Sequence, residues 1–451
     1  MPFLCETRDC GPLAQSLYSA LVKSVELPMA RNASPEPSPA TQTGHSPWDA
    51  LRDAGLGGGV PSFAWESPDG TCLAARGVAA AWNGEGAERF ERAKAWAVRG
   101  NDSAQAGGFQ GLESIFVGGF AFGSTPRPAE SFPNAALWLP ERLWLREPGR
   151  AIREIARTRT SEGESANHPL RSGAPALECC GRDWSPAEWR DAVEAALRLI
   201  EGALLEKVVL ARSREIVGSR AWDPATIFET LRSAFPECFH FYCDDGNGRV
   251  FLGASPERLV SLRDGRVQAD AMAGTARRDP RDPEDGAMSD TLRSDRKERH
   301  EHAVVVREIV AALRARSVDA TAPPEPSVAR VRHLLHLRTR VDGTAPPGTH
   351  VLDLVSSLHP TPAVAGAPAA AALEFLLAHE PRARGWYAGP IGWMDRAGNG
   401  DFTVGLRSAL LDGNRALLLA GAGIVWGSDP DREWNECESK MAYLEEILTR
   451  G

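Results

Sequence analysis

The sequence lacks the features of a membrane-spanning or secreted protein. Among its 451 residues, apolar stretches such as Ala416–Val425 fall well short of the roughly 20 residues that a helix needs to cross a bilayer. The first 31 residues include Glu6, Asp9 and Glu26, and they have neither the basic start nor the clean apolar run of a secretory signal. We therefore expect a cytoplasmic protein that does not span a membrane.

The sequence also lacks the patterns of a nucleic-acid-binding protein and of a disulfide or zinc framework. The formal net charge is −9, and no run of Lys and Arg is long enough to hold a phosphate backbone. The eight cysteines form no CxxC pair and no Cys/His spacing typical of zinc. We expect reduced thiols, with the adjacent Cys179 and Cys180 as small buried side chains rather than a redox pair, and no nucleic-acid partner.

What is present is ordinary for a globular protein with a sizeable core: 43% of residues are apolar and 25% are charged. The Ser- and Pro-rich stretch at 32–47 is expected to be a mobile loop. The segments 114–122 and 136–146 have the aromatic, β-branched, Gly and Pro content of strands. We expect residues 1–180 to be a variable, sheet-rich portion of the fold with no functional constellation of its own.

From residue 184 onward, helical and strand patterns are mixed without a regular βαβ repeat, which predicts an α+β architecture with largely antiparallel sheet. Helical spacing of apolar residues and a Ser185 cap signal predict the first helix. The predicted helices are 186–204, 299–316 and 431–448. The predicted strands are 207–212, 240–243, 250–253, 402–411 and 416–425.

Two ionisable residues stand where acid–base chemistry is possible. Lys207 lies inside an apolar strand, where a core-facing ammonium is costly unless it is paired or loses its proton, and such a lysine can act as a base. Glu257 follows a predicted strand end, where a poorly solvated carboxyl group would keep its proton to a higher pH and could donate it. The alternatives are an edge-strand lysine with its ammonium in water, and a surface pair of Glu257 with Arg258 or Arg263.

Carboxylates recur on two of the predicted helices. They are Glu298, Glu301 and Glu308 on one and Glu433 and Glu436 on the other. Mg²⁺ usually takes one or two carboxylates, keeps several waters and completes its shell with substrate oxygens, so one glutamate from each helix would suffice. The alternative is a solvated face, in which Glu436 and Lys440 form an i,i+4 pair that contributes only about 0.2–0.5 kcal/mol.

Two glycine-rich segments, 273–275 and 420–423, offer backbone N–H groups suited to holding a carboxylate. Neither is followed by GK[ST] or lies in a strand-to-helix unit, which excludes the common nucleotide-binding motifs. As ordinary tight turns, the two segments would need no ligand.

Together, in their order along the chain and in their residues, these segments resemble one family, the chorismate-utilising enzymes that make isochorismate, anthranilate, aminodeoxychorismate and salicylate. The resemblance is specific and covers roughly residues 184–448. Its motifs are KVVLAR at 207–212, LGASPERL at 252–259, AGT at 273–275, HEH at 300–302, LHPTPA at 358–363, LR at 406–407, AGAGIV at 420–425, GSDP at 427–430, and EWxE at 433–436 followed by Lys440. It implies antiparallel sheets packed as a sandwich with flanking helices, an active site in the cleft between them, chorismate as substrate, Mg²⁺ as cofactor, and a monomer.

Position by position, the resemblance implies that Lys207 is a general base that activates water and that Glu257 is the general acid. It implies that Glu301 and Glu436 are direct magnesium ligands, with Glu298 and Glu433 close by. The residues that it implies for substrate binding are Arg407, Lys440, His359 in the same cleft, and the amides around Gly274, Thr275, Gly421, Ala422 and Gly423.

Within the family, three places favour water over ammonia as the nucleophile. Lys207 stands where anthranilate synthases have a neutral Gln, and Ala273 stands where aminodeoxychorismate synthases have a nucleophilic lysine. The segment 359–363 resembles the isochorismate-forming type. We therefore expect conversion of chorismate to isochorismate, for either menaquinone or siderophore synthesis. The alternatives are a salicylate synthase, which also eliminates pyruvate, and a non-catalytic chorismate-binding subunit.

Overall fold

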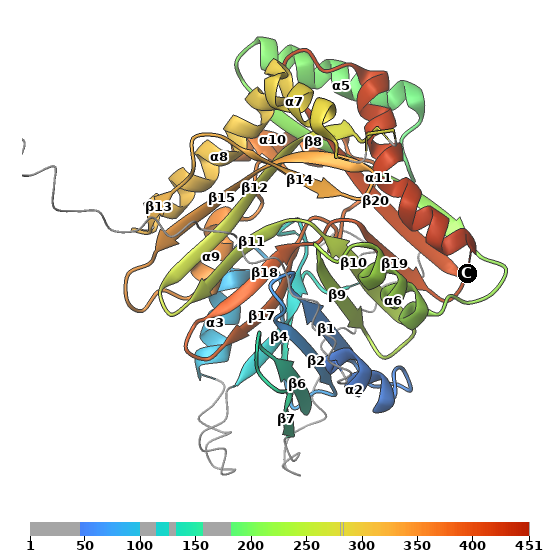
Figure 1. Cartoon of the computed structure of the whole chain (residues 1–451), viewed down its shortest axis with the longest axis vertical. Coiled ribbons are helices and arrows are strands. Elements are labelled where there is room, and N and C mark those ends of the chain that lie inside the picture. Colours follow the sequence, from blue (N-terminus) through green and yellow to red (C-terminus); the bar gives the residue numbers. More distant parts are fainter. Residues whose placement is uncertain are drawn as a thin grey trace, which may run out of the picture. The chain divides into compact units, whose positions relative to one another are not determined.

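The fold consists of two large antiparallel sheets with helices packed around them (Figure 1). The computed structural model describes residues 46–99, 114–125, 132–156, 182–279, 281–282 and 284–450, and these belong to one compact unit. The prediction of an α+β fold with largely antiparallel sheet is confirmed. Most of the predicted loop at 32–47, as well as Cys179 and Cys180, lies outside the described residues. The end of that loop was wrong, because Ser46 caps a helix that begins at Pro47.

The first sheet has ten strands, and each neighbouring pair is antiparallel. In spatial order the strands are β16 (Gly366–Ala367), β8 (Lys207–Val217), β20 (Arg415–Ile424), β19 (Ser408–Asp412), β10 (Arg249–Ser255), β9 (Phe239–Asp244), β1 (Ser62–Glu66), β2 (Cys72–Arg76), β6 (Arg142–Arg146) and β7 (Arg153–Ala156). One side of this sheet therefore consists of four strands from the N-terminal portion, β1, β2, β6 and β7, and the other strands come from the C-terminal portion.

The second sheet is built in the same way and also has ten strands. In spatial order they are β13 (Asp319–Thr321), β15 (Leu334–Thr344), β12 (Arg266–Arg277), β11 (Arg258–Arg263), β18 (Gly400–Val404), β17 (Pro390–Asp395), β4 (Ile115–Phe120), β5 (Ala135–Leu139) and β3 (Ala80–Gly84), with β14 (Ser327–Val331) also paired to β15. Residues 46–156 thus contribute strands to both sheets and do not form a separate layer.

Several helices begin at recognisable cap signals, namely α2, α5, α6, α8 and α9. A capping box formed by Ser185 and Glu188, with a proline at the first position, starts the helix that follows residue 185. The helices are α2 (Pro47–Asp53), α3 (Arg89–Arg99), α5 (Pro186–Glu201), α6 (Pro224–Ala234), α7 (Gly286–Ser294), α8 (Arg296–Ala315), α9 (Val351–Leu358), α10 (Ala369–His379) and α11 (Pro430–Arg450). In Figure 1, α8 lies along β12 and α11 lies along β20, which brings the two glutamate-bearing helices onto the strands of the two sheets.

Two segments predicted as single strands are each divided between the two sheets. The predicted strand 136–146 breaks at Pro140, so β5 joins the second sheet and β6 the first. The predicted strand 402–411 breaks before residue 408, where Arg407 has the left-handed φ of 48°. The chain also crosses between the sheets at Pro256 and Glu257, between β10 and β11. Glu257 and Arg407 therefore stand at points where the chain passes from one sheet to the other.

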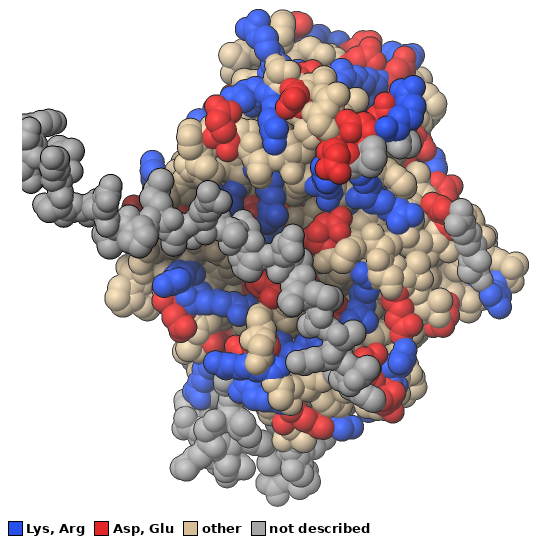
Figure 2. All heavy atoms as spheres, in the orientation of Figure 1, with Lys and Arg blue, Asp and Glu red and all other residues tan. Residues whose placement is uncertain are grey.

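The surface and the core agree with a globular protein. On the face that Figure 2 shows, basic and acidic side chains are interspersed. In the described part of the chain, no helix is both long enough and apolar enough to span a bilayer. The described cysteines, Cys72, Cys238, Cys243 and Cys437, are buried free thiols.

Candidate active site

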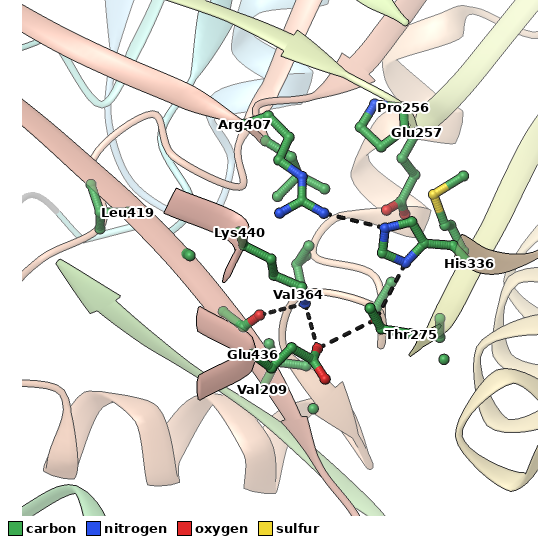
Figure 3. Close-up of a pocket in the computed structure, with 18 of the residues that line it drawn as sticks. Val209, Pro256, Glu257, Thr275, His336, Val364, Arg407, Leu419, Glu436 and Lys440 are labelled. Carbon is green, nitrogen blue, oxygen red and sulfur yellow. Dashed lines mark hydrogen bonds and ion pairs between the residues drawn. The ribbon is translucent and has the colours of Figure 1, made fainter. Parts of the chain in front are cut away.

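A pocket of about 700 Å³, open to solvent, lies where β8, β12 and β20 meet α8 and α11 (Figure 3). Most of the residues implied by the resemblance line it. These are Glu257, Gly274, Thr275, Glu301, Arg407, Gly421, Gly423, Glu436 and Lys440. Residues separated by more than 150 positions in sequence are thus brought to one pocket by the strand order of the two sheets.

Lys207, the first residue of β8, is fully buried at 0% exposure. Its Nζ lies 2.9 Å from Oε1 of Glu301, which lines the pocket. The neighbouring strand β20 permits this approach, because a Cβ atom on Gly423 would lie 2.2 Å from Glu301 Oε1 and 3.1 Å from Lys207 Cε. The alternative of an edge-strand lysine with its ammonium in water is therefore wrong, and the buried charge is compensated by a partner.

Glu257 is buried at 2% exposure, and its Oε1 has no hydrogen-bond partner within the described residues. Burial raises the pKa of Glu257 to about 8, with a further contribution from Asp270, while Lys207 and Lys440 act in the opposite direction. The alternative of a surface pair with Arg258 or Arg263 is wrong, because Glu257 is buried and both arginines pair with Asp401, at 3.1 Å and 3.8 Å. Glu257 is thus a carboxyl group that remains protonated at neutral pH and faces the pocket.

The four glutamates that the resemblance implies near a metal, Glu298 and Glu301 of α8 and Glu433 and Glu436 of α11, form two layers. Glu301 and Glu436 line the pocket, whereas Glu298 accepts a hydrogen bond from the Thr275 amide at 2.8 Å and Glu433 accepts one from Lys297 at 2.8 Å. Burial raises the pKa of Glu433 to about 7, offset in part by Lys297 and reinforced by Glu436. The pKa of Glu298 is likewise raised by burial and then by Glu301.

These carboxylates fit a hard cation that takes its remaining ligands from a substrate. Within the ranges that the structure describes, no three His, Cys, Asp or Glu side chains form a ready-made metal site. Four carboxylates nevertheless converge on one region, and the raised pKa of Glu298 and of Glu433 reflects their mutual repulsion as well as burial. Mg²⁺ usually takes only one or two protein carboxylates, and Glu301 and Glu436 are the two of these four that line the pocket.

Basic side chains stand opposite these carboxylates. Lys440 Nζ lies 2.7 Å from Glu436 Oε1 and donates a hydrogen bond to the Gly421 carbonyl oxygen at 2.8 Å. Burial is the largest influence on Glu436 and would raise its pKa, but Lys440, Lys297 and other nearby groups together outweigh it, and the pKa lies below its ordinary value. Arg407 points into the pocket from the sheet crossing (Figure 3). The pocket can therefore hold an anionic substrate and a cation side by side.

His336, which the sequence analysis missed, connects Arg407 to Glu436 through Thr275. Arg407 Nη2 lies 3.2 Å from His336 Nε2, and His336 Nδ1 lies 3.3 Å from Thr275 Oγ1. A guanidinium only donates, so Nε2 accepts and Nδ1 carries the proton, which it donates to Thr275. Thr275 Oγ1 in turn donates to Glu436 Oε1 at 3.4 Å. Burial, followed by Arg407 and Lys440, lowers the pKa of His336 to about 3, so this chain contains a neutral imidazole (Figure 3).

Three of the groups predicted to bind the substrate are not placed as predicted. His359 does not line this pocket but a second one, where its Nε2 lies 3.0 Å from the Phe122 carbonyl oxygen. Ala422 does not line it either, because side chains alternate along β20 and Ala422 is buried in the core between Gly421 and Gly423. The Thr275 amide is engaged by Glu298. The segment 420–423 is strand rather than turn.

Other residues around the pocket gave no clear signal in the sequence. Lys297 pairs with Glu433 behind the pocket, and Arg384 lines the pocket while holding β8 through the Val209 carbonyl oxygen. His336 could have been noticed as a polar residue flanked by Leu335 and Leu337 in an apolar strand. Its partners, however, come from β12 and from the crossing before β19, and only the sheet topology reveals them.

Comparison with known proteins shows what this arrangement is similar to. Residues 45–449 match the family model described as chorismate binding enzyme. The chain is 35% identical over 415 residues to the salicylate biosynthesis isochorismate synthase of Pseudomonas aeruginosa, a match that covers 86% of this chain and 85% of the relative.

Two solved structures are similar over most of the chain. The first is the 2,3-dihydroxybenzoate-specific isochorismate synthase, DhbC, from Bacillus anthracis, with a TM-score of 0.72 and 27% identity over 90% of this chain and 100% of that one. The second is MenF, the menaquinone-specific isochorismate synthase from Escherichia coli, with a TM-score of 0.70 and 29% identity over 86% of this chain and 88% of that one.

Proposed function

The chain belongs to the family of chorismate binding enzymes, and from that membership we propose that it is an isomerase that converts chorismate to isochorismate. The observation that carries the proposal is a buried carboxyl group facing the pocket, Glu257, whose pKa is raised to about 8, together with the fully buried Lys207, whose amine contacts Glu301 in the pocket wall. A base on one side and an acid on the other are what a hydroxyl exchange across a ring requires.

In the proposed reaction, the Lys207 amine is the group that accepts a proton from a water molecule, whose oxygen forms a bond to C2 of the ring. Protonated Glu257 donates its proton to the hydroxyl group at C4, which leaves as water when the C4–O bond breaks. The double bonds of the ring move between these two positions. One water enters and one leaves, so the product is an isomer of the substrate. The raised pKa of Glu257 supports its role as the acid.

Mg²⁺ is the cofactor that we propose for this site. Glu301 and Glu436 would hold it directly, with Glu298 and Glu433 beside them, because these carboxylates converge without a complete set of protein ligands. When bound, the ion would neutralise the negative charge of a substrate carboxylate. The basic groups of Arg407 and Lys440 are the side chains that we propose for orienting the substrate carboxylates.

Incubation with chorismate and Mg²⁺, followed by chromatography, tests the function. We expect isochorismate as the only new product. Salicylate, which fluoresces, would indicate that pyruvate is also eliminated. Chorismate binding without turnover would indicate a non-catalytic subunit and would contradict the proposal.

The acid role of Glu257 predicts a specific pH dependence. We expect kcat/KM for chorismate to fall as the pH rises through about 8, because Glu257 loses the proton that it must donate. The Glu257→Gln variant should lose about 10²–10⁴-fold in kcat. A kcat/KM that stays constant from pH 7 to pH 10 would contradict the assignment.

The same pKa shift should appear in stability. A carboxyl group whose folded pKa is raised from 4.5 to about 8 stabilises the fold below pH 4.5, and that contribution is lost as the pH rises through about 8. The midpoint of thermal unfolding should therefore decline less between pH 5 and pH 8 in Glu257→Gln than in the unchanged protein.

Removal of the metal should abolish turnover, and the protein itself should report binding. We expect EDTA to stop isochorismate formation, Mg²⁺ to restore it, and Mg²⁺ to raise the unfolding temperature, since an ion at about 100 times its Kd adds about 2.7 kcal/mol of stability. Glu301→Gln and Glu436→Gln should lose the rise. Glu308→Gln, a change on α8 at a side chain that is 41% exposed, should retain it. A rise retained in all three variants would place the ion elsewhere.

We further propose a cytoplasmic, monomeric enzyme. We propose that it feeds menaquinone or siderophore synthesis, since the similar proteins carry names that refer to salicylate, 2,3-dihydroxybenzoate and menaquinone.

A further inference from the structure

Lys297 is a charged residue behind the catalytic pocket for which the proposed reaction gives no role. It is the second residue of α8, and its side chain is 16% exposed. A cation in the first turn of a helix opposes the helix dipole, so the stability of α8 itself does not account for this lysine. The contacts that it makes with two carboxylates do account for it.

The two carboxylates come from different helices. Lys297 Nζ lies 2.8 Å from Oε1 of Glu433 on α11 and 3.5 Å from Oε1 of Glu298 on α8. The side chains of both glutamates are buried, at 1% and 5% exposure. Because α8 packs on β12 and α11 packs on β20, the ammonium joins elements that lie on different sheets. Without it, two buried carboxylates would stand close together with no charge between them, and they would repel each other.

The proposed metal ligands stand about one turn further along the same two helices. Glu301 follows Glu298 by three positions on α8. Glu436 follows Glu433 by three positions on α11. Each proposed ligand therefore shares a helix face with one of the outer glutamates, and repulsion between the outer glutamates would also move the ligands apart. Thr275 links the two layers directly, because its amide donates to Glu298 at 2.8 Å and its hydroxyl donates to Glu436 at 3.4 Å.

We infer that Lys297 is a positioning residue, whose ammonium holds the outer glutamates together and thereby keeps Glu301 and Glu436 where Mg²⁺ can bind both. Lys297 is not among the described residues that line the catalytic pocket, so it acts on the reaction only through these carboxylates. Removal of a side chain that orients metal ligands typically weakens metal binding by about 10–100-fold. The inference rests on the proposed function, because it concerns the cofactor proposed for that reaction.

Isothermal titration calorimetry of the full-length protein with magnesium chloride tests the inference. We expect Lys297→Met to bind Mg²⁺ about 10–100-fold more weakly than the unchanged protein, and Lys297→Arg, which can pair with two carboxylates, to recover most of the loss. A charge effect alone has the opposite sign, because removal of a cation near the site would strengthen the binding of another cation. At saturating Mg²⁺, kcat for chorismate in Lys297→Met should lie within about threefold of the unchanged value, since the loss is in metal binding.

A matched control is Arg299→Met, which removes another paired cation from the same end of α8. Arg299 lies 2.9 Å from Glu325, and its side chain is 42% exposed. This variant should bind Mg²⁺ like the unchanged protein. Circular dichroism shows whether each variant folds. If Lys297→Met does not fold, Lys297→Gln answers the question, because its neutral amide can still donate to Glu433 but should leave Mg²⁺ binding at least about fivefold weaker.

The outcomes separate this inference from the proposed function. Equal or tighter Mg²⁺ binding in Lys297→Met overturns the inference, as do an equal loss in Arg299→Met, no recovery in Lys297→Arg, and no binding to the unchanged protein. In each of these cases, conversion of chorismate by the unchanged protein leaves the proposed function standing. A loss of Mg²⁺ binding that is specific to Lys297, in a protein that does not convert chorismate, shows that the proposed function fails while the positioning role stands.

Discussion

The variant Lys207→Ala is expected to lower kcat for isochorismate formation by about 10²–10⁴-fold, the usual contribution of a general base. The amine is fully buried and lies 2.9 Å from Glu301, so no solvent-exposed group can replace it at that place. The loss should appear in kcat more than in KM for chorismate, because the proposed base acts on water and not on the carboxylates of the substrate.

Loss of the buried partner also leaves Glu301 uncompensated, at a cost of about 3–5 kcal/mol in the free energy of unfolding. Lys207→Met also leaves Glu301 without its partner, but it keeps the apolar stem and leaves no large cavity. It should lose as much activity as Lys207→Ala while unfolding at a higher temperature. Steady-state kinetics with chromatographic detection and thermal unfolding followed by circular dichroism measure both quantities.

A matched control is Lys94→Ala, which removes another paired lysine. Lys94 Nζ lies 2.7 Å from Asp353, away from the catalytic pocket, and both side chains are partly exposed. This variant should keep its turnover. Near-normal kcat in Lys207→Ala, or an equal loss in Lys94→Ala, would show that Lys207 is not the base.

The residues of the catalytic pocket could be identified from the sequence mainly because the order of the motifs along the chain resembles that of one family. Taken locally, Lys207 was compatible with a solvated edge strand and Glu257 with a surface ion pair. The choice between these states depends on burial, which depends on partners more than 100 positions away, such as β20 beside β8. The motif order provided that information indirectly, whereas hydrophobic periodicity alone could not.

The places where the sequence analysis failed share a physical cause. Segments 136–146 and 402–411 were each predicted as one strand, yet each passes from one sheet to the other, at Pro140 or Arg407. Local propensity reports that a residue is extended but not which sheet it joins. His359 was misplaced for the same reason, because the end of α9 turns its ring toward Phe122 and the second pocket.

Hydrogen-bond partners that come from different elements could likewise not be predicted from the sequence. The chain from Arg407 through His336 and Thr275 to Glu436 uses a sheet crossing, two neighbouring strands and a helix. No spacing within any one of these segments requires the others. Such a chain becomes visible only when the register of β12 against β15 places Thr275 opposite His336.

The second large effect is expected for Gly423→Ala, a change that adds one methyl group. The backbone of Gly423 lies in β20, opposite Val209 of β8, and its φ is not in the left-handed region, so alanine meets no backbone strain there. The added Cβ would lie 2.2 Å from Glu301 Oε1, a contact that cannot persist. Because the obstacle is the end of a flexible side chain, the carboxylate can move at a small cost in stability.

That movement is what should impair the enzyme. A displaced Glu301 loses its 2.9 Å contact with Lys207 and its place at the proposed cation site. A misplacement of about 1 Å at a reacting group can cost about 10²-fold in rate, so we expect kcat/KM for chorismate to fall by about that factor. The unfolding temperature should change far less than in Lys207→Ala, which distinguishes a positional effect from unfolding.

Two alanine variants on other glycines make the comparison quantitative. At Gly421 the nearest atom to an added Cβ is Val209 Cγ1 at 3.1 Å, so Gly421→Ala should lose less activity than Gly423→Ala. At Gly286, the first residue of α7, an added Cβ meets nothing within 4 Å, and activity should be unchanged. If Gly423→Ala turns over chorismate as well as Gly286→Ala does, then the close approach of Lys207, Glu301 and β20 is not required for catalysis. The base would then have to be sought elsewhere in the pocket.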